Sequence, residues 1–167
     1  MLDATNLSDL PVILALERSP DNAPFIRQWP EAKHEAAIAD PNIAHLKVVV
    51  ANQIVGYTIL VGLQNFDQSL ELKRLVIALK GQGLGRQTIQ EIQAMAFQDH
   101  GMHRLWLEVL CDHAVAYSLY TSMGFQVEGV HREALRQSVN SSPNAGDRYL
   151  DLTVMSMLRH EYEALPG

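Results

Sequence analysis

Three glycines alternate with other residues in the segment Lys80-Gly81-Gln82-Gly83-Leu84-Gly85-Arg86. The apolar run Leu75–Ala78 precedes this segment, and apolar residues at helical spacing follow it. A glycine-rich turn between a strand and a helix points free backbone N–H groups at one spot, and the helix dipole adds partial positive charge there. Phosphate groups suit such a spot. A tight strand-to-helix connection would use the same glycines, so the loop by itself leaves both interpretations open.

Other motifs for phosphate binding or hydrolysis do not fit the sequence. The glycine spacing differs from the G-x-G-x-x-G of dinucleotide-binding folds, and no Gly-Lys-Ser/Thr of a Walker A loop follows it. Neither a G-x-S-x-G elbow nor an H-E-x-x-H pair occurs, so serine-hydrolase and zinc-protease chemistry have no support. The single cysteine, Cys111, excludes an intrachain disulfide and a cysteine-rich zinc site, and we expect no metal.

The hydrophobic pattern changes its period along the chain. It predicts helices over residues 9–18, 25–39 and 114–123, and another that follows the glycine loop and ends at Gly101. It predicts strands over residues 45–50, 54–63, 70–79, 104–110, 125–130 and 149–158. This order is not a regular βαβ alternation. It predicts a mixed α/β fold of the α+β type, in which helices cover the faces of a mixed sheet.

Length and composition limit the class of protein. With 167 residues we expect one domain covering residues 1–167. Lys and Arg number 13 and Asp and Glu 19, and the net charge of −6 argues against nucleic acid as the main partner but suits cationic substrates. No apolar run approaches the roughly 20 residues that span a bilayer, and the start lacks a secretory signal. We therefore expect a cytoplasmic protein without membrane contact. A homodimer is compatible with the sequence, which does not determine the oligomeric state.

A second motif follows, His113-Ala114-Val115-Ala116-Tyr117-Ser118-Leu119-Tyr120-Thr121-Ser122-Met123-Gly124-Phe125. Together with the glycine loop it resembles the GNAT superfamily of acyl-CoA-dependent N-acetyltransferases. That family shows Arg/Gln-x-x-Gly-x-Gly/Ala and then Asn-x-x-Ala-x-x-Leu-Tyr-x-x-x-Gly-Phe; Lys80 and His113 are the departures. The resemblance covers about residues 45–158. It implies a GNAT-like sheet of about six or seven strands, splayed between its two central parallel strands, with helices on both faces.

The resemblance also implies where acetyl-CoA would bind. The amides of the loop would wrap the diphosphate, and these belong to Gln82, Gly83, Leu84, Gly85 and Arg86. Pantetheine would pair with the bulged strand at Leu75, Val76 and Ile77, where an amide near Ile77 would hold the developing oxyanion. By their pattern alone these three residues are plain core. His113, Ala116 and Tyr120 of the second motif would also contact the cofactor, and we expect His113 to keep a hydrogen-bonding or structural role.

Acetyl transfer needs a neutral amine and a proton donor for the leaving thiolate. The resemblance assigns the donor role to Tyr120, with Tyr117 as a fallback that more readily packs against the core. In the ribosomal-protein N-terminal acetyltransferases a base stands twelve residues before this tyrosine, which is the position of Glu108. An exposed Glu108, or one paired with Arg104 or Arg132, is the alternative, and Glu71 is the rival base. A covalent route through Cys111 has little support, since a cysteine at a strand end is usually a small apolar filler.

The acceptor is less constrained. Residues 125–133 and 149–158 resemble the ribosomal-protein branch, but polyamine and antibiotic acetyltransferases share this pattern. The resemblance places the acceptor site near Phe25, Trp29 and Glu31 and at the polar loop 137–148. Trp29 is either a pocket wall or a packing residue, and the loop, which we expect to be mobile, is either a lid or a long hairpin.

Three hypotheses remain for the function. The first is direct acetyl transfer, in a ternary complex, from acetyl-CoA to a peptide or protein amine. The second is the same chemistry on a polyamine or aminoglycoside, and the third is a non-catalytic acyl-CoA-binding module. An acidic acceptor pocket would favour polyamines, whereas an open groove would favour peptides.

Overall fold

The computed structural model describes residues 1–137 and 147–166, and in these residues seven strands form one sheet in the order β1-β2-β3-β4-β5-β7-β6. The strands are β1 (Leu2–Ala4), β2 (Ile43–Val50), β3 (Gln53–Val61), β4 (Ser69–Ile77), β5 (Arg104–Leu110), β6 (Gln126–Gln137) and β7 (Arg148–Leu158). Strands β4 and β5 are parallel, and the other neighbouring pairs are antiparallel. The expected mixed sheet is confirmed.

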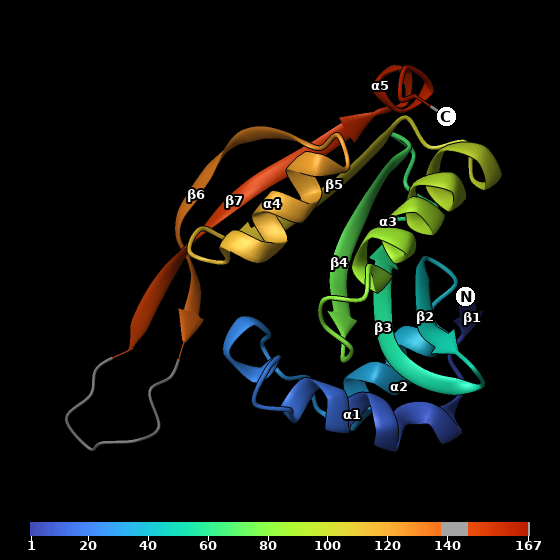
Figure 1. The fold of residues 1–167 in the computed structure, drawn as a ribbon, viewed down its shortest axis with the longest axis vertical. Helices are drawn as coiled ribbons and strands as arrows, with labels where there is room; N and C mark the ends of the chain where they lie inside the picture. The colour runs from blue at the N-terminus through green and yellow to red at the C-terminus, as the bar shows by residue number, and fades with distance from the viewer. Residues whose placement is uncertain (138–146, 167) are drawn as a thin grey trace.

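Helices cover both faces of this sheet (Figure 1). On one face lie α1 (Leu10–Arg18) and α2 (Glu31–Ala39), and on the other lie α3 (Leu84–Ala94), its π-helical end η3 (Met95–Asp99), and α4 (Ala114–Ser122). Short helical segments are η1 (Leu7–Asp9), η2 (Ala23–Phe25) and α5 (Arg159–Glu163). Among the described residues, no helix is both long and apolar enough to cross a membrane.

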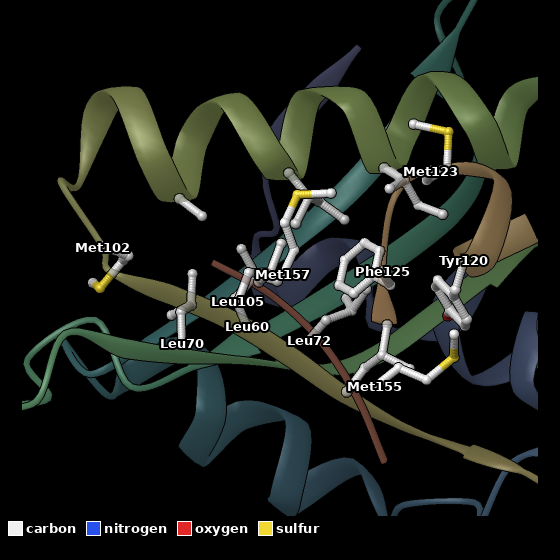
Figure 2. Close-up of a cluster of buried hydrophobic side chains, with 14 of the residues drawn as sticks. Leu60, Leu70, Leu72, Met102, Leu105, Tyr120, Met123, Phe125, Met155 and Met157 are labelled. Carbon is white, nitrogen blue, oxygen red and sulfur yellow. The ribbon is translucent and has the colours of Figure 1, made fainter. Parts of the chain in front are cut away.

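The larger hydrophobic core lies between α3, α4 and the sheet (Figure 2). Ile89 and Ile92 are fully buried on one side of α3, as their three-residue spacing predicts. They belong to the same cluster as Leu72 of β4, Leu107 of β5 and Met155 of β7. Complete burial of such a side chain stabilises the fold by about 1.5–3 kcal/mol. The core therefore anchors α3 and α4 on the strands that flank the site.

A bulge in β4 changes which face its side chains occupy. The register of β3 against β4 shifts between Ile59 and Leu60, which leaves Lys73 as an extra residue in β4. One extra residue reverses the alternation of side chains along a strand. Leu72, before the bulge, packs against the α3 side, whereas Val76, after it, packs with α1.

The two parallel strands pair only where they begin. Residues 69–71 of β4 lie opposite residues 104–106 of β5. Beyond that point β4 continues to Ile77 and β5 to Leu110 without pairing with each other. β5 keeps β7 and β6 beside it, so the sheet divides into two arms (Figure 1). The expected splay between the central parallel strands is confirmed.

Several predicted boundaries differ from the structure. The helix expected over residues 25–39 begins only at Glu31, because Pro30 is its N-cap and η2 already ends at Phe25. The short elements β1 and α5 were not expected. β6 extends to Gln137 and β7 begins at Arg148, so most of the polar segment 137–148 lies outside the described residues.

Candidate functional site

The glycine loop joins the end of β4 to the beginning of α3. Gly81 and Gly83 both have a φ of +75°, in the left-handed region that favours glycine, and Gly83 is the N-cap of α3. A Cβ atom placed on either glycine would meet no other atom within 4 Å. The backbone conformation, rather than crowding, therefore requires glycine here, and the space in front of the loop is open.

The amides of residues 82–86 belong to this turn and to the beginning of α3. In the part of the chain that the structure describes, none of these five N–H groups donates to a protein acceptor. Together with the dipole of the 11-residue helix α3, they form a region of positive potential suited to a phosphate. The Arg86 guanidinium is tied to the end of α4 by Ser122 Oγ at 2.7 Å.

Lys80 links the loop to the other side of the site. Its Nζ donates to Asn22 Oδ1 at 2.7 Å. Burial lowers the pKa of Lys80, and the negative charge of Asp21 opposes this effect.

Backbone groups of β4 are available inside the splay. The Ala78 amide donates to the Val55 carbonyl of β3 at 2.8 Å. Because N–H groups alternate in direction along a strand, the amides of Leu75 and Ile77 point away from β3, toward the side that β5 has left. An extended ligand in the splay would meet them.

A cavity of about 420 Å³ lies at the splay and brings together residues from both arms. Its lining includes eight of the residues that the sequence singled out: Phe25, Trp29, Glu71, Leu75, Glu108, His113, Ala116 and Tyr120. Val76, Ile77 and residues 82–86 do not line it, and neither do Glu31, Tyr117 and Cys111.

Tyr120 lies at one end of the large core, beside Phe125, with 5.8 Å between the ring centroids (Figure 2). The side chain is only 9% exposed, and among the described residues its hydroxyl has no hydrogen-bond partner. Burial raises the pKa of Tyr120 to about 12. The hydroxyl therefore keeps its proton at neutral pH, and it belongs to a residue that lines the cavity.

Two carboxylates line the same cavity. Glu108 accepts a hydrogen bond from His131 Nδ1 at 2.8 Å. Glu71 is paired with Lys73 at 2.9 Å. Arg104, one of the ion-pair partners considered for Glu108, instead binds Glu128 at 2.6 Å. The sequence could not identify His131 because the irregular pairing of β6 with β7 decides which β6 side chain reaches β5.

His113 stands immediately before α4 and stacks on Phe25 of η2, with 3.9 Å between the ring centroids and 9° between the planes. Burial lowers the pKa of His113, and the charge of Lys80 adds to this effect. The stack connects the loop between α1 and α2 with the beginning of α4. It gives His113 a structural contact across the cavity that its position in the motif did not reveal.

Glu17, which supports Trp29 in the wall of the cavity, was not identified from the sequence. Glu17 is fully buried, and its Oε1 lies 2.5 Å from Arg74 Nη1 and accepts the Tyr57 hydroxyl. Its Oε2 accepts the Trp29 backbone amide at 3.0 Å. The Arg74 guanidinium lies over the Trp29 ring, 4.4 Å from the centroid. The available signal was Glu17 itself, which continues the apolar face of α1 one turn after Ile13.

Comparisons with known proteins agree with this geometry. A model of the acetyltransferase (GNAT) family matches residues 10–125, and the chain belongs to this family. It is 29% identical over 113 residues to the N-alpha-acetyltransferase RimI of Mycobacterium tuberculosis, which is 66% of this chain and 69% of that protein. The chain is thus an acetyl-CoA-dependent N-acetyltransferase, and the reading as a non-catalytic module is not supported.

Solved structures share the fold over nearly the whole chain. The spermidine N-acetyltransferase of Vibrio cholerae in complex with CoA and spermine has a TM-score of 0.82 at 23% identity, covering 98% of this chain and 97% of that one. A chimera of that enzyme with hSSAT has a TM-score of 0.81 at 22% identity, covering 98% of both chains. At this identity the likeness establishes the fold and leaves the acceptor open.

Proposed function

We propose that this enzyme transfers the acetyl group of acetyl-CoA directly to the primary amine of a peptide or protein. One observation carries the proposal: Tyr120 and Glu108 line the same cavity at the mouth of the splay. Tyr120 brings a hydroxyl that has no hydrogen-bond partner among the described residues, and Glu108 brings a carboxylate. In this arrangement a proton donor and a proton acceptor flank the place where a thioester and an amine would meet.

The substrate thioester would be held by main-chain groups. The free amides of residues 82–86 would bind the diphosphate, and the pantetheine arm would lie in the splay beside β4. The amide of Ile77, which points into the splay, is the candidate donor to the oxygen of the thioester carbonyl as negative charge develops on it.

The proton balance gives each side chain a task. The amine nitrogen bonds to the acetyl carbon, the carbon–sulfur bond breaks, and the proton that the amine loses balances the one that the thiolate gains. Neutralising a lysine-like amine at pH 7 costs about 4.6 kcal/mol, and an α-amine about 1.4 kcal/mol. Glu108 would take the proton of the ammonium through water and release it to solvent. The second proton, which the nitrogen loses after it bonds to the acetyl carbon, replaces the one that Tyr120 gives to the sulfur. Tyr120, kept protonated by burial, would donate to the sulfur.

The length of the groove supports a peptide acceptor. A second cavity of about 500 Å³ adjoins the first and shares Phe25, Ile26, Arg27 and Leu135 with it. Two adjoining cavities suit an extended chain better than a compact amine. The small-amine alternative is supported by the structural likeness to an enzyme that has been solved with spermine.

The test is thiol release from acetyl-CoA with a panel of acceptors. The panel contains peptides with a free amino terminus, the same peptides with that terminus blocked, a lysine-containing blocked peptide, spermidine and an aminoglycoside. We expect the free peptides to give the highest kcat/KM. A higher value for spermidine or the aminoglycoside would support the alternative, and no release with any amine would contradict the proposal.

The variant Glu108→Gln tests the base. It keeps the shape of the side chain but cannot accept the proton, so we expect kcat/KM to fall by about 10²-fold or more with the best acceptor. The matched control is Glu163→Gln, because Glu163 is exposed on α5 and outside the cavity lining. Full activity in Glu108→Gln together with a large loss in Glu71→Gln would transfer the role to Glu71.

A further inference from the structure

The charge of the groove is opposite to that of the whole chain. The net charge of the protein is −6. The 420 Å³ cavity, however, is lined by five cationic side chains and two acidic ones. The cations are Arg27, Lys33, Lys73, Arg74 and Lys80, and the acids are Glu71 and Glu108. A cleft lined mainly by one sign of charge attracts ligands of the other sign.

Two of these cations form ion pairs with neighbouring carboxylates. Lys73 is paired with Glu71 at 2.9 Å, and Arg74 with the buried Glu17 at 2.5 Å. A third, Lys80, belongs to the glycine loop, and its Nζ is held by Asn22 Oδ1 at 2.7 Å. These three therefore do not define the charge that the acceptor would meet.

Arg27 and Lys33 remain. Neither forms an ion pair with any acidic side chain among the described residues. Lys33 Nζ lies 4.2 Å from the centroid of the Trp29 ring, and Arg27 Nη2 donates to the Arg136 carbonyl at 3.0 Å. Both cations are thus positioned by neutral partners and keep their charge available.

The support beneath Lys33 is rigid. The Trp29 ring contacts Arg74 as well as Lys33, and the Trp29 amide is bonded to Glu17. This support comes from fully or largely buried groups, since the side chains of Glu17 and Arg74 are 1% and 8% exposed. A held cation loses less conformational entropy when it binds an anion than a freely moving one does.

We propose that the acceptor is an acidic peptide, whose carboxylate side chains near the reacting amine bind Arg27 and Lys33. This inference rests on the proposed function. A polyamine would bring its further ammonium groups against these two cations, and such like-charge contacts oppose binding. A free amino acid is also disfavoured, because its carboxylate lies next to its amine and would not reach the second cavity, which Arg27 also lines. Arg27 also lines the second cavity, beyond the one that contains Glu108, where the side chain of a longer acceptor would reach.

The experiment compares acceptors of equal length in the thiol-release assay. One peptide has Asp and Glu after its amino-terminal residue, the second has Asn and Gln at the same places, and the third has Lys at both. Spermidine and free glutamate complete the set. We expect kcat/KM for the acidic peptide to exceed that for the amide peptide by about five- to tenfold, with the lysine peptide lowest. The advantage should shrink as salt is raised.

Charge reversal tests the assigned residues. In Lys33→Glu and Arg27→Glu we expect the order of the acidic and lysine peptides to invert. Lys47→Gln is the control, since Lys47 lies on β2, is paired with Asp9, and does not line the groove, so the acidic preference should persist. Circular dichroism verifies that each variant is folded.

The outcomes separate this inference from the proposed function. Equal rates for the acidic and amide peptides, or a preference for the lysine peptide, spermidine or free glutamate, would overturn the acidic-peptide acceptor while acetyl transfer itself stands. Unchanged preference in both charge-reversal variants would overturn the roles of Arg27 and Lys33. Absence of thiol release with every amine would instead contradict the proposed function.

Discussion

At the scale of single residues, the site depends on a buried phenol that lacks a partner. Tyr120 is embedded beside Phe125 in the large core, and among the described residues nothing accepts its proton. The core holds the hydroxyl in place, and the incoming cofactor sulfur would supply the missing acceptor.

Replacing this hydroxyl should separate chemistry from binding. In Tyr120→Phe we expect kcat to fall by about 10²-fold or more, while the Kd for coenzyme A changes by no more than about twofold. Tyr117→Phe is the matched control, because Tyr117 lies on the same helix, is 37% exposed and does not line the cavity. Single-turnover kinetics and calorimetry give the two quantities. A parallel loss of affinity and rate would contradict the role of Tyr120 as proton donor.

At the scale of elements, the connection between β4 and α3 forms the proposed diphosphate site. The strand ends at Ile77, two left-handed glycines turn the chain, and α3 begins at Leu84. Among the described residues, the first amides of α3 donate to no protein acceptor. Packing of Ile89 and Ile92 fixes the axis of α3 and hence the direction of these amides. The local sequence thus determines the conformation of the glycine loop, and distant core contacts determine the direction of α3.

A side chain at the helix N-cap should disturb this loop. In Gly83→Val we expect coenzyme A affinity to fall by at least about tenfold, because a β-branched residue strongly disfavours the φ of +75° and the loop must rearrange. Gly129→Val serves as the control, since Gly129 lacks a positive φ and a Cβ there would meet nothing within 4 Å. Calorimetric titration measures the affinity. An unchanged Kd in a folded Gly83→Val protein would remove the diphosphate from this loop.

At the scale of the whole molecule, a buried polar network joins the amino-terminal strand, α1, α2 and the sheet. His45 Nδ1 lies 3.0 Å from Thr5 Oγ1, and His45 Nε2 lies 3.0 Å from His34 Nδ1. His34 Nε2 is 3.3 Å from Glu17 Oε1 but is not aligned for a hydrogen bond. Through Glu17 the network reaches Trp29, so the stability of this half of the molecule and the shape of the cavity that Trp29 lines are connected.

This network should make stability depend on pH. Burial, helped by the neighbouring His34, lowers the pKa of His45 to about 4, from an ordinary value of 6.5. Between pH 6.5 and 4, His45 therefore binds a proton in the unfolded chain but not in the folded chain. The free energy of unfolding consequently falls as the pH falls through this window. Urea unfolding at pH 7, 6 and 5 measures this slope.

Two variants isolate the contribution of His45. We expect His45→Gln to be less stable at pH 7, because its contacts with Thr5 and His34 change, but to show a flatter dependence on pH. His100→Gln removes an exposed histidine and should keep the original slope. If His45→Gln and the unmodified protein had the same slope, His45 would not be the titrating group.

Local sequence determined much of this protein. The alternation of Leu105, Leu107 and Val109 specified β5, and the glycines at 81 and 83 specified the turn before α3, because hydrophobic period and backbone conformation are properties of neighbouring residues. The family was expected from two short motifs, and the splay was expected from the resemblance that these motifs carry, whereas the order of the strands in the sheet was not predicted. The start of α2 was missed because Pro30 outweighed the apolar pattern around it.

Only the tertiary structure decided which distant side chains meet. The bulge at Lys73 turns Arg74 toward Glu17, the β6 register brings His131 to Glu108, and the fold stacks Phe25 on His113. Such pairs depend on register and on the angle between elements, which hydrophobic period does not encode. The tertiary structure also decides that an acidic protein has a cavity lined mainly by cations. A count of charges along the chain does not tell where each charge lies in space.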